Sequence, residues 1–223
     1  MNLIEYPDRE LMALALAKQI AGELAQGLRL SGRASLSVPG GTTPGPVFDI
    51  LSGADLDWSQ VTVFLGDERW VPETSPRSNT AQLRARLLRD RAAAARLVPL
   101  YADTPDPEPA LGALAEGIVP HLPITVLLLG MGEDMHTASL FPGADRLADA
   151  LAPDAPPLMA LRAPGVPEPR ITLTVPVLSH ALHTHVLITG AAKRAAVLAA
   201  ENLPPAEAPI RAVLNHATIH WAE

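Results

Sequence analysis

The chain has 223 residues, of which 48% are hydrophobic and 18% charged, a balance typical of a globular protein and far from that of a disordered one. Seventeen basic residues against 24 acidic ones give a net charge of −7, and the basic residues are scattered, which argues against a nucleic-acid partner. The absence of cysteine excludes disulfides, thiolate metal sites and cysteine nucleophiles.

The longest strongly apolar stretch, residues 124–131, is too short to span a bilayer and is typical of a buried strand. The first ten residues, MNLIEYPDRE, lack the basic and apolar segments of a signal peptide. We therefore expect a cytoplasmic protein with no membrane partner. Nothing in the sequence indicates the oligomeric state.

The pattern of apolar residues predicts strands and helices that alternate along the chain. Helical spacing predicts an opening helix over residues 8–30, after Pro7 as a start signal. Prolines cluster in segments that we expect to be stiff loops, at 103–109, 153–157 and 163–169. Strands and helices are then expected in turn over 34–38, 46–52, 61–65, 79–90, 124–129, 185–190 and 191–200.

Near-continuous apolar strands that alternate with helices predict an α/β fold, with a Rossmann-like, mostly parallel sheet and helices on both faces. No repeat of solenoid length and no linker divides the sequence, so residues 1–223 are expected to form a single domain. In such a sheet the loops that follow the strands gather at one edge, where ligands bind.

The first of these loops, PGGTTPG at 39–45, combines a glycine turn with two hydroxyls in front of a predicted helix. Free N–H groups at a helix start favour an anion such as phosphate. The same pattern can also simply join a strand to a helix. Its spacing matches neither the Walker loop nor the dinucleotide fingerprint, so no nucleotide cofactor is indicated.

Two further loops place charged side chains after strands. The segment LGDERWVP carries Asp67, Glu68 and Arg69, and an arginine there could hold phosphate through paired N–H donors. A surface cluster of ion pairs is the alternative. Lys193 lies in the first turn of a predicted helix, where a cation is unfavourable unless an anion lies nearby. A solvated lysine at a frayed turn would also explain its position.

The loop GMGEDMHTASLFPG contains one histidine beside an acid. His136 follows Asp134 by two residues, so the carboxylate could hydrogen-bond one ring nitrogen and leave the other to take a proton. A solvated histidine without a catalytic role is the alternative. Ser139 lacks the elbow pattern of a nucleophilic serine. His183 and His185 have no third ligand at a diagnostic spacing, so we predict no metal site.

Several segments together resemble the 6-phosphogluconolactonase family, which shares a sugar-phosphate fold group with glucosamine-6-phosphate deaminases. They are SVPGGTTP, VFLGDERWVP with Ser78 and Asn79, LLLGMGEDMHTASLFPG, RITLTVPVL and ITGAAK, in the family's order and spacing. The match covers nearly the whole chain. It implies hydrolysis of 6-phospho-D-glucono-1,5-lactone to 6-phospho-D-gluconate in the oxidative pentose phosphate pathway, with no cofactor.

The resemblance also implies roles for individual residues. His136 would be the general base that activates water, and Asp134 would orient it. Lactone opening needs such a water, positive charge for the developing oxyanion and a phosphate handle for positioning. The residues that would bind the substrate and its phosphate are Gly40, Gly41, Thr42, Asp67, Arg69 and Lys193.

This sequence departs from the family pattern at two positions. Met135 stands between Asp134 and His136, where the family usually has glycine. If that position requires a positive φ, methionine strains the loop. Thr42 stands where serine is common, and it keeps the hydroxyl.

Two alternative functions are less well matched. The deaminase branch uses a glutamate where Phe141 stands here, and DERWVP resembles the lactonase branch. A non-catalytic sugar-phosphate sensor would normally carry an added DNA-binding segment, for which an opening helix at residue 8 leaves no room. The pair Asp134 and His136 also favours turnover, although the fold and phosphate binding alone would not.

Overall fold

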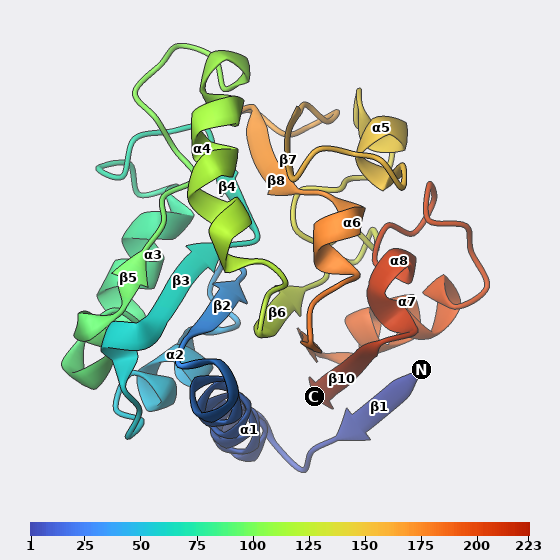
Figure 1. Cartoon of the computed structure of the whole chain (residues 1–223). Helices are drawn as coiled ribbons and strands as arrows, with labels where there is room; N and C mark the ends of the chain where they lie inside the picture. The colour runs from blue at the N-terminus through green and yellow to red at the C-terminus, as the bar shows by residue number, and fades with distance from the viewer.

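A sheet of seven parallel strands forms the centre of the computed structural model, which describes all residues from Met1 to Glu223 (Figure 1). Its strands are β1 (Asn2–Glu5), β2 (Ala34–Val38), β3 (Val61–Leu65), β5 (Arg96–Leu97), β6 (Val126–Gly130), β9 (His183–Thr189) and β10 (Ala217–Ala222). They are arranged in the order β1-β10-β9-β6-β2-β3-β5, and every neighbouring pair is parallel. The predicted α/β fold with a mostly parallel sheet is confirmed.

The order of the strands reverses between β2 and β6. From β2 the chain adds β3 and then β5 on one side, and from β6 it adds β9 and then β10 on the other. Strands β2 and β6 pair in parallel through Leu36 with Val126 and Ser37 with Leu127. Their following loops therefore leave the sheet in opposite directions, which opens a crevice at the carboxyl ends of these two strands.

Helices cover both faces of the sheet. They are α1 (Arg9–Ser31), α2 (Gly45–Leu51), α3 (Asn79–Arg86), α4 (Leu111–Ile118), α5 (Leu147–Leu151), α6 (Val175–Leu178), α7 (Ala191–Ala200) and α8 (Arg211–Leu214). The long helix α1 packs on β2, β6 and β10, whereas α6 and α8 lie on the opposite side of the sheet (Figure 1). Between the layers, 55 buried hydrophobic residues form one core.

The opening helix lies where its sequence predicts it. Asp8 caps its start by accepting a hydrogen bond from the N–H of Leu11 at 2.8 Å. Gly32 follows its end with φ +69°, a left-handed conformation that glycine adopts without a steric penalty, and its N–H donates to the carbonyl of Leu28. The six buried residues of α1 recur at helical spacing and face the sheet.

The structure differs from the sequence prediction in several elements. The helix expected over 79–90 ends at Arg86, and a 3₁₀ turn over Asp90–Ala94 follows it. The strands β1 and β10 were not predicted, and neither was a second sheet of three antiparallel strands. Those three strands are β4 (Asp67–Arg69), β7 (Leu158–Leu161) and β8 (Arg170–Leu173), in the order β4-β8-β7. Strands of three or four residues are too short to show a period.

No helix of the structure is both long enough and apolar enough to cross a membrane.

A chain of buried polar side chains joins α1 to the sheet. Glu23 of α1 accepts a hydrogen bond from His185 of β9 at 2.8 Å, and His185 lies 3.1 Å from His220 of β10 through ring nitrogens. The second ring nitrogen of His220 lies 2.8 Å from the hydroxyl of Tyr6. His183 adds a weaker contact to Glu23 at 3.6 Å. Every ring nitrogen of the two buried histidines therefore has a partner.

Burial, together with the charge of His185, lowers the pKa of His220 from 6.5 to about 4. Burial also opposes ionisation of Glu23, but the hydrogen bond and charge of His185 outweigh it and lower the pKa of Glu23. His220 is therefore neutral in the folded protein at neutral pH, whereas in the unfolded chain it gains a proton below about pH 6.5.

We expect the free energy of unfolding to fall as the pH drops from about 6.5 towards 4. In this range His220 binds a proton in the unfolded chain but stays neutral in the folded protein. The loss from this histidine should reach roughly 3 kcal/mol. In His220→Gln, urea titrations should show a slope against pH that is smaller by about 1 kcal/mol per pH unit between pH 6 and 5. The exposed His216→Ala should keep the wild-type slope; an equal slope in all three proteins would contradict the assignment.

Candidate active site

A cleft of about 530 Å³ opens at the carboxyl ends of β2, β3, β6 and β9, where the reversal of strand order places it. The loops after these strands supply most of its wall, and the proline-rich segment around Pro167 supplies the rest. The side chains and glycines of its wall that enter the argument below are Gly40, Gly41, Thr42, Asp67, Arg69, Arg77, Asn79, Gly132, His136, Phe141, Arg170 and Lys193.

The loop after β2 approaches its neighbours too closely for any residue but glycine. A Cβ on Gly40 would collide with the side-chain amide of Asn79, which itself donates to the carbonyl of Asp67 at 3.1 Å. Gly41 has φ +86°, in the left-handed region that favours glycine. The backbone carbonyl of Thr42 then closes the turn by accepting a hydrogen bond from the N–H of Gly45, the first residue of α2. The loop thus presents backbone and hydroxyl groups to the cleft.

Glu68 organises the floor beside this loop. Its side chain is fully buried, and its two carboxylate oxygens accept hydrogen bonds of 2.7 to 3.1 Å. The donors are the N–H groups of Arg69, Asn79 and Thr80 and the hydroxyls of Ser78 and Thr80. The alternative of a surface ion-pair cluster is therefore wrong for Glu68, because this carboxylate caps the start of α3 and fixes the backbone on which Arg69 and Asn79 stand.

Asp67 is almost buried and lies in the wall of the cleft. Its Oδ2 accepts a 2.6 Å hydrogen bond from the hydroxyl of Ser139 and lies 3.7 Å from Arg170. Ser139 is itself fully buried and engaged with this acid, so it is not an exposed nucleophile. Burial lowers the pKa of Arg170, and the charge of Asp67 opposes that shift. The acid therefore holds a desolvated guanidinium at the cleft.

His136 and Asp134 form the pair that their spacing predicts. Asp134 Oδ1 lies 2.5 Å from His136 Nδ1 and also accepts the N–H of His136 at 3.2 Å. Because a carboxylate only accepts, Nδ1 carries the proton and Nε2 is left as the basic nitrogen. The side chain of His136 is 30% exposed and lines the cleft, whereas Asp134 supports it from behind.

The backbone of this loop is held in a conformation that methionine adopts only with strain. Met135 has φ +65°, so the position does require a positive φ, as the departure from the family glycine suggested. Its carbonyl accepts the N–H of Ile210 at 3.1 Å, and its N–H donates to the carbonyl of Gly132 at 3.0 Å. A Cβ on Gly132 would collide with His136 Nδ1 and Asp134 Oδ1, so that glycine leaves room for the pair.

Phe141 joins the histidine to a cation. Its ring centroid lies 4.3 Å from that of His136, and the guanidinium carbon of Arg170 lies 5.6 Å from the same centroid. The phenyl ring thus contacts both the imidazole of His136 and the guanidinium of Arg170. His136, Phe141 and Arg170 therefore lie at the same end of the cleft.

Positive charge dominates the wall of the cleft although the chain as a whole is acidic. Four cations, Arg69, Arg77, Arg170 and Lys193, face one acid, Asp67. Arg69 donates to the carbonyl of Arg77 at 2.6 Å, and Arg77 is paired with Glu168. Lys193 forms no ion pair, and it stands in the first turn of α7 after Gly190, which has φ +83°. Low-dielectric walls lined by one sign of charge favour an anionic ligand.

The structure brings the residues predicted from sequence together. Seven of them, Gly40, Gly41, Thr42, Asp67, Arg69, His136 and Lys193, line this cleft, and Asp134 binds one of the seven. Sequence reasoning did not single out Arg77, Asn79 or Arg170 as site residues. Two of them belong to segments that the sequence analysis quoted, since Asn79 follows Ser78 and Arg170 is the first residue of RITLTVPVL.

The other histidines do not gather around the cleft, and no group of three or more His, Cys, Asp or Glu side chains is arranged to hold a metal ion. His183 and His185 both contact Glu23, within the polar chain described above.

Comparison with known proteins shows similarity over the whole chain. The family model of glucosamine-6-phosphate isomerases/6-phosphogluconolactonase matches residues 7–221. The chain is 43% identical over 230 residues to a 6-phosphogluconolactonase of Rhizobium meliloti, covering 100% of this chain and 98% of that protein. It is 42% identical over 220 residues to the 6-phosphogluconolactonase of Pseudomonas aeruginosa, covering 94% and 90% of the two chains.

Solved structures have the same fold. A 6-phosphogluconolactonase from Shewanella baltica superposes with a TM-score of 0.96 at 31% identity, covering 100% of this chain and 98% of that one. A monomeric glucosamine-6-phosphate deaminase superposes with a TM-score of 0.82 at 18% identity, covering 100% and 98%, and so shares the fold.

Replacing Glu68 with Gln should lower the free energy of unfolding by about 2–4 kcal/mol, because an amide NH₂ would face N–H donors that the carboxylate now satisfies. Urea titrations at pH 7 measure this. The matched control is Glu73→Gln, since Glu73 is exposed and paired with Arg84, and its change should stay within about 0.5 kcal/mol. Equal losses in the two variants would refute the structural role of Glu68.

Proposed function

Because the chain belongs to the family of glucosamine-6-phosphate isomerases and 6-phosphogluconolactonases, we propose that it opens its substrate with a water molecule that His136 activates. The enzyme is a lactonase: it hydrolyses 6-phospho-D-glucono-1,5-lactone to 6-phospho-D-gluconate in the oxidative pentose phosphate pathway. The observation that carries the mechanism is the hydrogen-bonded pair of His136 and Asp134 within a cleft lined by cations.

His136 acts as the general base. With Nδ1–H donated to Asp134, its Nε2 takes a proton from water as the water oxygen attacks the lactone carbonyl. The imidazolium that forms is stabilised by the carboxylate of Asp134. When the tetrahedral intermediate collapses, the bond from the carbonyl carbon to the ring oxygen breaks and that oxygen receives a proton, which yields the open-chain acid. His136 is suited to return the proton, since it holds it at that stage.

Arg170 supplies positive charge near the carbonyl. Its guanidinium lies at the same end of the cleft as His136, because both side chains contact Phe141. It is 11% exposed, so solvent screens its charge weakly. A fixed cation at this end stabilises the oxyanion that develops on the carbonyl oxygen.

The phosphate is held by the other groups of the cleft. Gly40, Gly41 and Thr42 offer N–H groups and a hydroxyl, and Arg69 and Lys193 offer charge. Asp67 contributes by keeping Arg170 in place at 3.7 Å. Anchoring the phosphate positions the lactone carbonyl against His136. Binding energy from the phosphate thus serves to align the carbonyl with the attacking water.

The deaminase alternative lacks its acid in this site. Phe141 occupies the position where the resemblance places the deaminase glutamate, and its ring packs against His136. A phenyl ring cannot relay a proton to a sugar ring oxygen.

We further propose that residues 1–223 act in the cytoplasm as one sugar-phosphate-binding domain, which the continuous core of 55 residues supports.

His136→Ala should lower kcat for lactone hydrolysis by about 10²- to 10⁴-fold, because the general base is lost. The assay follows loss of 6-phosphogluconolactone with the spontaneous hydrolysis subtracted, and glucosamine 6-phosphate is tested in parallel. His216→Ala removes an exposed histidine and serves as the control with unchanged turnover. Near-normal kcat in His136→Ala would exclude its role as base.

Lys193→Ala and Arg69→Ala should raise KM by roughly tenfold or more with a smaller effect on kcat, because each removes a charged contact to the phosphate. Lys18→Ala, which removes an exposed cation of α1, is the charge-matched control. Initial rates over a range of lactone concentrations separate the two constants. If KM is unchanged in both cleft variants, neither side chain binds the phosphate.

A further inference from the structure

A second group of basic side chains lies at the opposite end of the sheet from the active site. Arg33 directly precedes β2, Arg96 opens β5, and His121 ends the 3₁₀ turn Val119–His121 that leads towards β6. The active-site loops leave β2 and β6 at their other ends. A strand rises about 3.3 Å per residue, so roughly 20 Å of β2 separates Arg33 from Pro39 of the cleft.

The two arginines of this group form no ion pair within the protein. The lysines and arginines that form neither an ion pair nor a hydrogen bond are Lys18, Arg29, Arg33, Arg96 and Lys193. Of these, Lys193 lies in the active-site cleft, Arg33 lines one cavity with His121, and the charge of Arg96 also acts on His121. In a chain with a net charge of −7, whose other arginines mostly pair with acids, such a group is an exception.

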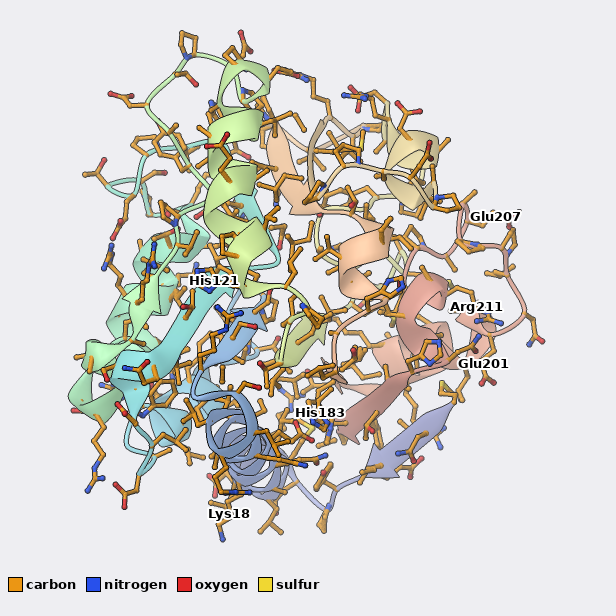
Figure 2. All side chains as sticks on the ribbon, in the orientation of Figure 1. Lys18, His121, His183, Glu201, Glu207 and Arg211 are labelled. Atoms are coloured by element: carbon orange, nitrogen blue, oxygen red, sulfur yellow. The ribbon has the colours of Figure 1, made fainter.

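A small cavity lies between Arg33 and His121. It has a volume of about 160 Å³, and its wall includes Arg33 and His121, the hydroxyls of Ser35 and Thr125, and no acid. Figure 2 labels His121 close to the point where α4 ends, on the side of the molecule turned towards the viewer. Its ring nitrogens make no hydrogen bond within the protein.

The floor of the cavity is built in advance. Ser35 and Thr125 exchange two hydrogen bonds of 3.0 Å, each from a backbone N–H to the other's hydroxyl oxygen, and Ser35 also donates to the carbonyl of His121 at 2.9 Å. These bonds tie the segment before β6 to β2, so the backbone of His121 is fixed relative to Arg33.

The like charges oppose one another. Burial lowers the pKa of His121, and the charges of Arg96 and Arg33 lower it further. An anion placed between Arg33 and His121 would offset this repulsion and pair with the forked guanidinium donors of Arg33.

We propose that Arg33 and His121, with Arg96 adding positive charge beside them, bind a small phosphate-bearing anion at the amino ends of β2 and β6, at a site separate from the active-site cleft. The ligand chemistry follows from one guanidinium group, a protonatable imidazole and a hydroxyl-lined floor, which suit an oxyanion with several acceptor oxygens. Its small volume favours inorganic phosphate or the phosphate group of a metabolite that projects from the cavity.

The test is an NMR titration of the His121 imidazole from pH 4 to 9, with inorganic phosphate in one series and sodium chloride at equal ionic strength in the other. Phosphate should raise the pKa of His121 by about half a unit or more, because the anion favours the imidazolium. Chloride should not. Equal shifts in the two series would mean that salt only screens the arginines, and would overturn the proposal.

Variants assign the response to this cavity. The double variant Arg33→Ala/Arg96→Ala alters two exposed side chains and should abolish the response to phosphate, while Arg29→Ala should retain it. A response that persists in the double variant refutes these ligands. In Lys193→Ala, which weakens the active-site cleft, the His121 response should remain; its loss there would trace the signal to the active site. The double variant should keep the wild-type rate of lactone turnover, because neither arginine lines the active-site cleft.

Discussion

The parallel pairing of β2 with β6 is the constraint on which the site depends. It joins the two halves of the sheet. From β2 the chain continues to one side of the sheet, and from the adjacent β6 it continues to the other side. The loop that carries Gly40 and Gly41 and the loop that carries His136 therefore face each other across one crevice. The groups proposed to bind phosphate and to activate water lie about a hundred residues apart in sequence, and they meet because of this single pair of strands.

Around that crevice, buried acids decide which cations are available to a ligand. The carboxylate of Glu68 accepts hydrogen bonds only from backbone N–H groups and hydroxyls. It therefore fixes the backbone of Arg69 without forming an ion pair with the Arg69 guanidinium. Asp67 lies 3.7 Å from the guanidinium of Arg170, and it also accepts a hydrogen bond from the hydroxyl of Ser139. The cleft can therefore be cationic in an acidic protein, since its acids are arranged to position the cations more than to cancel them.

Much of this arrangement could be predicted from the sequence, because parallel strands and their loops leave local patterns. The run ASLSV before PGGTTPG and the pair Asp134 and His136 are readable since they depend on neighbours in the chain. Arg170 could not be recognised in this way. Its role depends on β8 pairing with β4, a contact across about a hundred residues between strands too short to show a period. The sequence left a surface ion-pair cluster open as the alternative for Glu68, because four of its five hydrogen bonds come from residues 78–80, ten or more positions further along the chain.

The conformation of Met135 shows how strain is tolerated beside His136, the proposed general base. A left-handed methionine costs on the order of 1 kcal/mol relative to glycine. In return the carbonyl of Met135 accepts the N–H of Ile210, which ties the loop to the segment before α8, and the N–H of Met135 closes a turn on Gly132. These bonds over-determine the backbone, so the strained φ persists and Asp134 remains behind His136. The family glycine is thus replaceable here because the surrounding hydrogen bonds, and not the residue at this position alone, hold the turn.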